Sequence, residues 1–319
     1  MSAEYNQFRD LMRQSKYQQA ARLAEQAYVR EPQSRVFWLT QQAKALNRAG
    51  DHRSAYDVAD EALQIERANT YAVLAAADAL LGMGKAEQAR QYYAEGVSQP
   101  RLCDRARRGG LQCLAYLQQW QAVLAACDQG EAPPEERMSW RVKALAGLQR
   151  SDEAIEVCHQ WLKAKPHCAQ ALWELTELEI CRDGMEAVLE RLEKLIRIKS
   201  LPAVYREIYA SVCRRAGKPE LALKEYQNMG AAGGLRARRK QAFLLAQTGQ
   251  ESAALPMLEE LLRADPQDRY VHSSYQAACK RAGEAQRGID FYNELLTIFP
   301  DEKRIYGRIQ ALRSSIEAS

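Results

Sequence analysis

Small and apolar side chains along this chain fall into stripes of helical period, separated by short polar turns. One stripe has the i, i+3, i+4, i+7 spacing of a single helix face and consists of Ala20, Leu23, Ala24 and Ala27. A second stripe of the same kind consists of Ala55, Ala59 and Ala62. Pro32 closes the first stripe, since proline cannot continue a helix. The pattern predicts a chain that is helical throughout.

A glycine followed five positions later by a small residue marks the turns between these stripes. The phrase occupies 50–55, 84–89, 217–222, 249–254 and 283–288. Gly50 and Gly84 are 34 residues apart, as are Gly249 and Gly283, and as are Pro266 and Pro300. A fixed period of this size predicts a solenoid, in which each helix pair buries its apolar face against its neighbours.

We expect about nine helix-turn-helix repeats and a capping helix, forming one continuous solenoid. Repeats 1–4 are predicted in 1–131, repeats 5–7 in 135–229, repeats 8–9 in 235–300 and the cap in 301–319. Irregular joints are predicted at 131–135, which contains the Pro133-Pro134 step, and at the glycine-rich 230–234. The cap should bury Ile305, Ile309, Leu312 and Ile316 and expose Lys303, Arg304, Arg308 and Arg313.

The glycine turn, the small residues in both helices and the closing proline resemble the tetratricopeptide repeat. The first repeat carries the resemblance through Tyr17, Ala20, Ala24, Ala27 and Pro32. The second adds Trp38, Ala43, Gly50, Ala55 and Ala62, and the ninth adds Gly283, Tyr292 and Pro300. Repeats four, six and seven lack the closing proline, and repeat four has Gln118-Gln119 in place of the glycine, with Trp120 at the turn. The resemblance implies antiparallel helix pairs in a right-handed superhelix, whose first helices line a concave groove.

Composition agrees with a packed helical protein, because 47% of the residues are hydrophobic and only ten are proline. The eight cysteines contain no C-x-x-C pair and should be small buried residues in a reducing compartment. No basic head and apolar run begins the chain, and the longest apolar-rich stretch, 71–84, is too short to span a bilayer. We therefore expect a cytoplasmic protein without membrane contact.

Charge is distributed unevenly, although the net charge is only +4. The predicted solvent faces of the first helices carry Arg9, Arg13, Lys44, Arg48, Arg105, Arg108, Lys143, Arg214, Arg215, Arg236, Arg239, Lys240, Lys280 and Arg281. Their acidic exceptions are Asp78, Glu174, Glu177 and Glu207, whereas the second helices carry many acids. A groove lined by one sign of charge attracts ligands of the opposite sign, so we predict an acidic peptide or partner protein. The alternative is that these residues form ordinary solvated surface.

Other ligands have weaker motifs. The carboxylate clamp of co-chaperones of this family is incomplete, since Tyr5, Arg9, Gln41 and Lys44 occur without its asparagines. The basic clusters 105–108 and 236–240, with Tyr205, Tyr209 and Phe243 nearby, suggest phosphate contacts. These aromatics are expected in the core, however, and no nucleic-acid module is present.

Catalytic and cofactor motifs are also lacking. The sequences Cys158-His159 and His167-Cys168 match no common zinc spacing, and neither G-x-S-x-G nor H-E-x-x-H occurs. We expect no cofactor, no metal and no enzymatic activity. The sequence favours an interaction scaffold or adaptor; the alternatives are a regulatory adaptor that binds nucleic acid or a signalling component, and a non-catalytic subunit of a larger enzyme complex.

Overall fold

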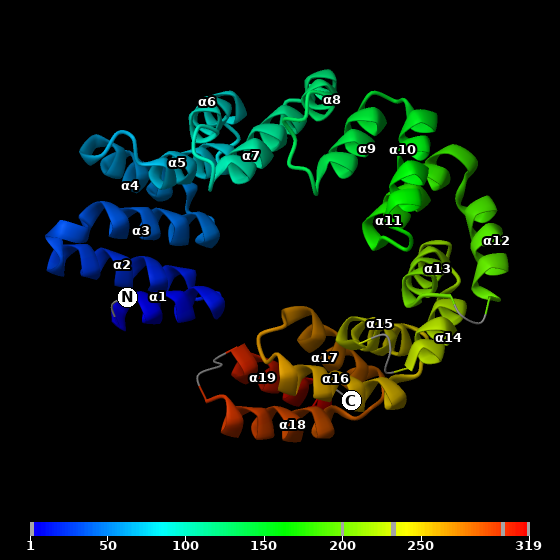
Figure 1. Cartoon of the computed structure of the whole chain (residues 1–319). Coiled ribbons are helices and arrows are strands. Elements are labelled where there is room, and N and C mark those ends of the chain that lie inside the picture. Colours follow the sequence, from blue (N-terminus) through cyan, green and yellow to red (C-terminus); the bar gives the residue numbers. More distant parts are fainter. Residues whose placement is uncertain (1–2, 199–200, 231–233, 301–303, 318–319) are drawn as a thin grey trace. The chain divides into compact units, whose positions relative to one another are not determined.

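The computed structural model describes residues 3–198, 201–230, 234–300 and 304–317. Within these ranges the chain forms nineteen α-helices and one 3-10 turn, with no strand (Figure 1). The helices group into two compact units, 1–164 and 165–319, which we term the N-terminal and C-terminal halves. None of the described helices is long and apolar enough to cross a membrane.

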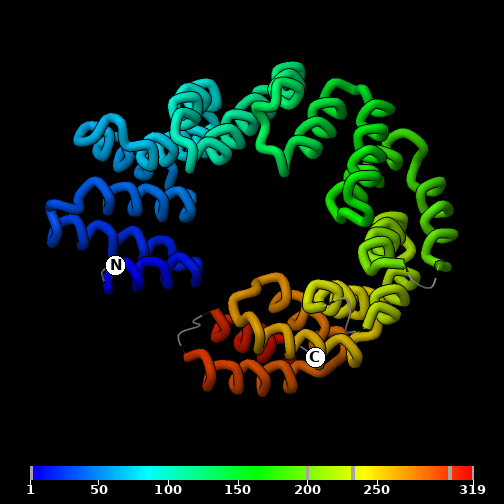
Figure 2. Tube along the Cα trace, viewed as in Figure 1, coloured from blue at the N-terminus to red at the C-terminus, as the bar shows by residue number. Residues whose placement is uncertain are grey.

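The N-terminal half consists of five successive helix pairs, in which the chain reverses between consecutive helices (Figure 2). Its elements are α1 (Ala3–Arg13), α2 (Tyr17–Arg30), η1 (Pro32–Ser34), α3 (Arg35–Ala49), α4 (His52–Ile65), α5 (Thr70–Gly82), α6 (Ala86–Gly96), α7 (Cys103–Tyr116), α8 (Trp120–Asp128), α9 (Arg137–Gly147) and α10 (Ser151–Ala164). Each helix packs on the next. In addition, α5, the first helix of the third pair, packs on α3 and α7, the first helices of the neighbouring pairs.

The predicted alanine stripes form the core of this half. Ala20, Ala24 and Ala27 of α2 are buried with Phe8 and Trp38 in one cluster. Ala55, Ala59 and Ala62 of α4 are fully buried as well. Because alanine has a short side chain, backbones approach closely and larger side chains from the neighbouring helix fill the remaining space.

The turns have the left-handed backbone that favours glycine. Gly50 has φ of 83°, and the backbone N–H of Asp51 donates to Leu46 O at 3.0 Å, which closes the end of α3. Gly84, Gly217, Gly249 and Gly283 also have positive φ. In repeat four the same conformation falls on Gln118, with φ of 56°. Trp120 begins α8 directly after this turn, as Tyr17 begins α2, so the two residues hold the equivalent positions that the sequence predicts.

The predicted joints and cap differ in how far the structure describes them. The 131–135 segment lies between α8 and α9, where Ala132 is buried and Glu136 N–H donates to Pro133 O at 3.0 Å. Most of the 230–234 segment, and Lys303 of the cap, lie outside the described residues. In α19 (Arg304–Glu317) the first three predicted apolar residues are buried, but Ile316 is 44% exposed because it lies in the last turn of the helix.

The C-terminal half continues the alternation of helices. Its other elements are α11 (Ala169–Asp183), α12 (Met185–Ile196), α13 (Ala203–Arg215), α14 (Pro219–Met229), α15 (Gly234–Gln247), α16 (Glu251–Ala264), α17 (Arg269–Arg281) and α18 (Ala285–Ile298). Consecutive helices pack together throughout, and first helices of successive pairs pack together in α11 with α13, α15 with α17 and α17 with α19.

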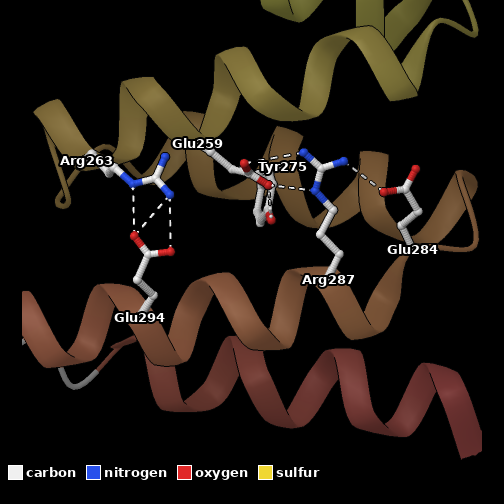
Figure 3. A network of polar contacts seen from close by, with 6 residues as sticks. All are labelled: Glu259, Arg263, Tyr275, Glu284, Arg287 and Glu294. Carbon is white, nitrogen blue, oxygen red and sulfur yellow. Dashed lines mark hydrogen bonds and ion pairs between the residues drawn. The ribbon is translucent and has the colours of Figure 1, made fainter.

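A polar network links α16, α17 and α18 in this half (Figure 3). The hydroxyl of Tyr275, whose side chain is fully buried, donates to Glu259 Oε1 at 2.9 Å. The guanidinium of Arg287 donates to the same carboxylate from Nε at 2.9 Å and also binds Glu284. Three helices therefore share one ionic centre inside their packing.

Most cysteines are core residues, as expected. Cys113, Cys127, Cys158, Cys213 and Cys279 are buried, and burial raises the pKa of Cys113, Cys127 and Cys279 to about 11. Three cysteines depart from the expectation, since Cys103 and Cys168 are half-buried and Cys181 is exposed near the end of α11.

Candidate functional site

A cavity of about 530 Å³ lies among α11, α13, α14 and α15 of the C-terminal half. Its volume is within the range of ligand-binding clefts, roughly 300–1,000 Å³. The residues that give it chemical character are three cations and three aromatics: Arg214, Arg236, Lys240, Trp173, Tyr226 and Phe243. No carboxylate is among the described residues that line it.

Local helix geometry brings these side chains together. Arg236, Lys240, Phe243 and Gln247 occupy one face of α15 at spacings of four, three and four residues, while Leu245 and Ala242 lie in the core behind them. The cavity lies between α11, α13, α14 and α15, each of which contributes at least one lining residue.

The three cations lack a close ion pair within the described part of the chain. Arg214 and Arg236 are exposed and Lys240 is half-buried, and none of them forms an ion pair with any residue in the described part of the chain. Burial lowers the pKa of Lys240, and the charges of Arg236 and Arg214 lower it further, against a rise from Glu207. The site therefore has a local excess of positive charge.

Aromatic rings surround the ammonium group of Lys240. Its Nζ lies 5.6 Å from the ring centroid of Tyr226 and 6.0 Å from that of Trp173, which are cation–π distances. Tyr226 is buried, and burial together with the charge of Glu207 raises its pKa to about 12, so its phenol stays neutral. Trp173 and Phe243 are half-buried and leave part of each ring accessible.

Six of the fourteen residues predicted to line the groove already have carboxylate partners. These pairs are Arg13–Asp10, Arg105–Asp78, Arg108–Glu136, Arg215–Glu177, Arg239–Asp268 and Arg281–Glu251. All but the first join a helix to a neighbouring helix pair. Their charge is thus used in contacts between repeats, and we do not include them in the candidate site.

A second group of predicted residues comes together in the N-terminal half. Partial burial lowers the pKa of Lys44, and the charges of Arg105 and Arg48 lower it further. Asp78 lies among them and accepts from Arg105 at 2.5 Å and from Tyr93 at 2.5 Å. This cluster contains its own carboxylate, unlike the cavity lining.

The remaining predicted residues are separate from both groups. Lys143 lies over the ring of Trp140, with 5.0 Å from Nζ to the centroid. Arg9 belongs to α1 and Lys280 to α17, and neither forms an ion pair with a described residue.

Two aromatic residues of the cavity were not predicted from the sequence. Trp173 and Tyr226 lie on α11 and α14, and the repeat pattern alone does not show that these helices meet α15. Phe243 was expected in the core and is half-buried at the cavity instead. The available signal was its place on the same face of α15 as Arg236 and Lys240.

Comparisons with known proteins agree with this architecture. A tetratricopeptide repeat family profile matches residues 46–108. The crystal structure of a tetratricopeptide repeat protein from Parabacteroides merdae is 14% identical, with 75% of this chain and 96% of that chain covered and a TM-score of 0.50. YrrB, described as a tetratricopeptide repeat protein with an unusual peptide-binding site, is 15% identical, covering 59% and 97%, with a TM-score of 0.38. No curated protein sequence matches the chain.

Antiparallel helix pairs joined by left-handed turns, stacked in chain order, define a helical solenoid of the repeat class. Residues 46–108 match the tetratricopeptide repeat, and the described helices have the fold of a tetratricopeptide-repeat protein. Proteins with this fold are generally scaffolds for protein–protein interaction and are typically non-catalytic. The all-α solenoid predicted from the sequence is thereby confirmed, while the count of nine repeats stays a prediction.

Proposed function

We propose that this protein is an interaction scaffold whose C-terminal half docks an acidic segment of a partner protein. The observation that carries the proposal is the cavity at α11, α13 and α15, where Arg214, Arg236 and Lys240 meet without a carboxylate in the lining. Arginine forks and a lysine ammonium bind carboxylates through charge-assisted hydrogen bonds.

The electrostatics of Lys240 support an anionic ligand. Its pKa is lowered by burial and by two like charges, so its charged form is less favoured than that of a lysine exposed to solvent. A carboxylate beside it would reverse that effect, and the gain would appear as binding free energy. Elsewhere in the chain, five arginines bind carboxylates of a neighbouring repeat, which is the kind of contact that we propose for the ligand.

The nucleic-acid alternative has less support. In the 105–108 cluster, Arg105 and Arg108 bind Asp78 and Glu136. In the 236–240 cluster, Arg238 binds Glu260 and Arg239 binds Asp268. Cations that contact phosphates release the ions condensed on a nucleic acid, and they must be unpaired to do so. Four of the seven cations in these two clusters are already paired within the protein.

A direct binding titration tests the proposal. Fluorescein-labelled octaglutamate should bind the protein with a saturable change in anisotropy at low salt, whereas labelled octalysine should not. The variant Arg236→Glu/Lys240→Glu should bind octaglutamate at least about tenfold more weakly, because two attractions become repulsions.

The matched control is Lys224→Glu on α14, an exposed lysine outside the cavity lining. It changes the net charge by −2, half of the −4 of the double variant, and should leave the affinity almost unchanged. A loss of binding free energy in the control that is half of the loss in the double variant would mean that only overall charge matters, and the proposed site would be wrong.

A further inference from the structure

The lining of the cavity contains aromatic residues as well as cations, and attraction between charges accounts only for the cations. Arg214 and Arg236 are exposed cations that could bind a carboxylate on an open surface. Trp173 and Phe243 are half-buried and line the same space, so part of the lining is apolar and in contact with solvent. Apolar surface of this kind gains free energy when a ligand covers it.

We infer that the cavity binds an aromatic side chain of the partner that is flanked by acidic residues. This inference rests on the proposed function and specifies the ligand of the same site. The aromatic ring would enter between Trp173 and Phe243, while the neighbouring carboxylates contact Arg214 and Arg236. The cavity volume of about 530 Å³ accommodates a large side chain together with part of its backbone.

An aromatic ring suits this lining better than an aliphatic side chain. Rings pair with rings in offset or edge-to-face arrangements, which add to the free energy of area burial. The face of a ring also attracts cations, and Lys240 already lies 5.6 Å and 6.0 Å from two ring centroids. A third ring would therefore meet favourable partners on more than one side, whereas a leucine side chain would gain from burial alone.

Glu207 on α13 favours one placement of the acidic residues. Its charge acts on Lys240 and Tyr226, as do the charges of Arg214 and Arg236, but Glu207 does not line the cavity. A ligand carboxylate close to Glu207 would be repelled. The flanking acids are therefore expected to contact Arg214 and Arg236 and to avoid Glu207.

Four labelled peptides test the inference against the wild-type protein. The first has the core Asp-Glu-Trp-Glu-Asp; the second replaces tryptophan with serine, the third replaces it with leucine, and the fourth keeps tryptophan between serines. We expect the first to bind about tenfold more tightly than the second and several-fold more tightly than the third. The fourth should bind weakly, because it lacks the charges.

Two variants show whether the gain arises in the cavity. Trp173→Leu and Phe243→Leu keep an apolar residue in the lining, so the fold and the affinity for the serine peptide should persist. The advantage of the tryptophan peptide over the serine peptide should fall to about twofold or less.

The outcomes separate the two proposals. If the tryptophan and serine peptides bind equally well and Arg236→Glu/Lys240→Glu abolishes both, the aromatic inference is overturned and the proposed acidic site stands. If the tryptophan advantage persists in both leucine variants, the ring binds elsewhere and the inference is wrong. If no acidic peptide binds the wild-type protein, both proposals fail.

Discussion

Several glycines are present because a neighbouring helix leaves no room for a β-carbon. At Gly109 of α7 an added Cβ would overlap the ring of Tyr93, and at Gly147 of α9 it would overlap the ring of Trp120. Tyr93 is buried and its hydroxyl donates to Asp78, so its ring is not free to move. These two glycines thus let a large ring from one helix pack directly on the backbone of another.

Gly109→Ala should therefore destabilise the protein by about 1–3 kcal/mol, since overpacking a fixed ring forces side-chain or backbone shifts. The neighbouring Gly110 has open space around its Cβ position, so Gly110→Ala should instead stabilise α7 by up to about 1 kcal/mol. Urea denaturation of the two variants checks the opposite signs. A loss of stability in both variants would show that α7 does not tolerate alanine at either position, and that the contact with Tyr93 is not the cause.

The pKa of Lys240 gives a prediction for the pH dependence of binding. Because burial and Arg236 lower this pKa below the ordinary 10.5, the ammonium loses its proton earlier than other lysines as the pH rises. The affinity for octaglutamate should therefore begin to decrease at a lower pH than an ordinary lysine pKa of 10.5 would give, while the peptide stays fully ionised. Lys240→Arg should remove this decrease, because a guanidinium keeps its proton throughout. The same pH profile in both proteins would contradict a role for Lys240.

At the scale of elements, the polar network of α16, α17 and α18 joins three helices through one buried carboxylate (Figure 3). The side chain of Glu259 is only 13% exposed and receives hydrogen bonds from Tyr275 and Arg287. A second pair between the same helices, Arg263–Glu294, is 43% and 51% exposed. Solvent screens the second pair more than the first, because Glu259 is much less exposed than Glu294.

Tyr275→Phe should cost about 1–2 kcal/mol of unfolding free energy, because it removes a hydrogen bond to a buried charged group. Glu294→Ala, the surface control, should cost less than about 1 kcal/mol. A double-mutant cycle of Tyr275→Phe and Glu259→Gln should show coupling of at least about 0.5 kcal/mol. Additive losses would mean that the two residues stabilise the helices independently.

The sequence predicts helices and turns well because both depend on local chemistry. The stripe Ala20, Ala24 and Ala27 follows from helical period, and Gly50 follows from the left-handed backbone at its turn. Gln118 shows where this reasoning fails. It adopts the same conformation without being glycine, so the turn of repeat four was found from its place in the repeat and not from its own residue type.

The candidate site was only partly predictable. Arg236 and Lys240 are one helical turn apart, so their shared face is visible in the sequence. Which cations remain unpaired is not, because Arg215 and Glu177 are 38 residues apart and meet only when α11 and α13 pack together. The rings of Trp173 and Tyr226 likewise join the site through tertiary packing.

At the scale of the whole molecule, net charge gives little information about binding. The chain carries +4 overall, and much of its positive charge is held in pairs between neighbouring repeats. Specific attraction must then come from a place where cations outnumber acids. The described residues provide one such cavity, in the C-terminal half, which also has aromatic walls.

Fluorine NMR of protein labelled with 5-fluorotryptophan tests this account most directly. Of the five tryptophans, Trp38, Trp120, Trp140 and Trp161 belong to the N-terminal half, and Trp173 belongs to the C-terminal half and lines the cavity. Trp173→Phe assigns the fifth resonance. The ligand is the peptide with the core Asp-Glu-Phe-Glu-Asp, in which phenylalanine replaces tryptophan. We expect its titration to shift the Trp173 resonance saturably and to leave the other four resonances in place. Saturable binding that moves one of the other four resonances and leaves Trp173 unchanged would contradict the proposed site.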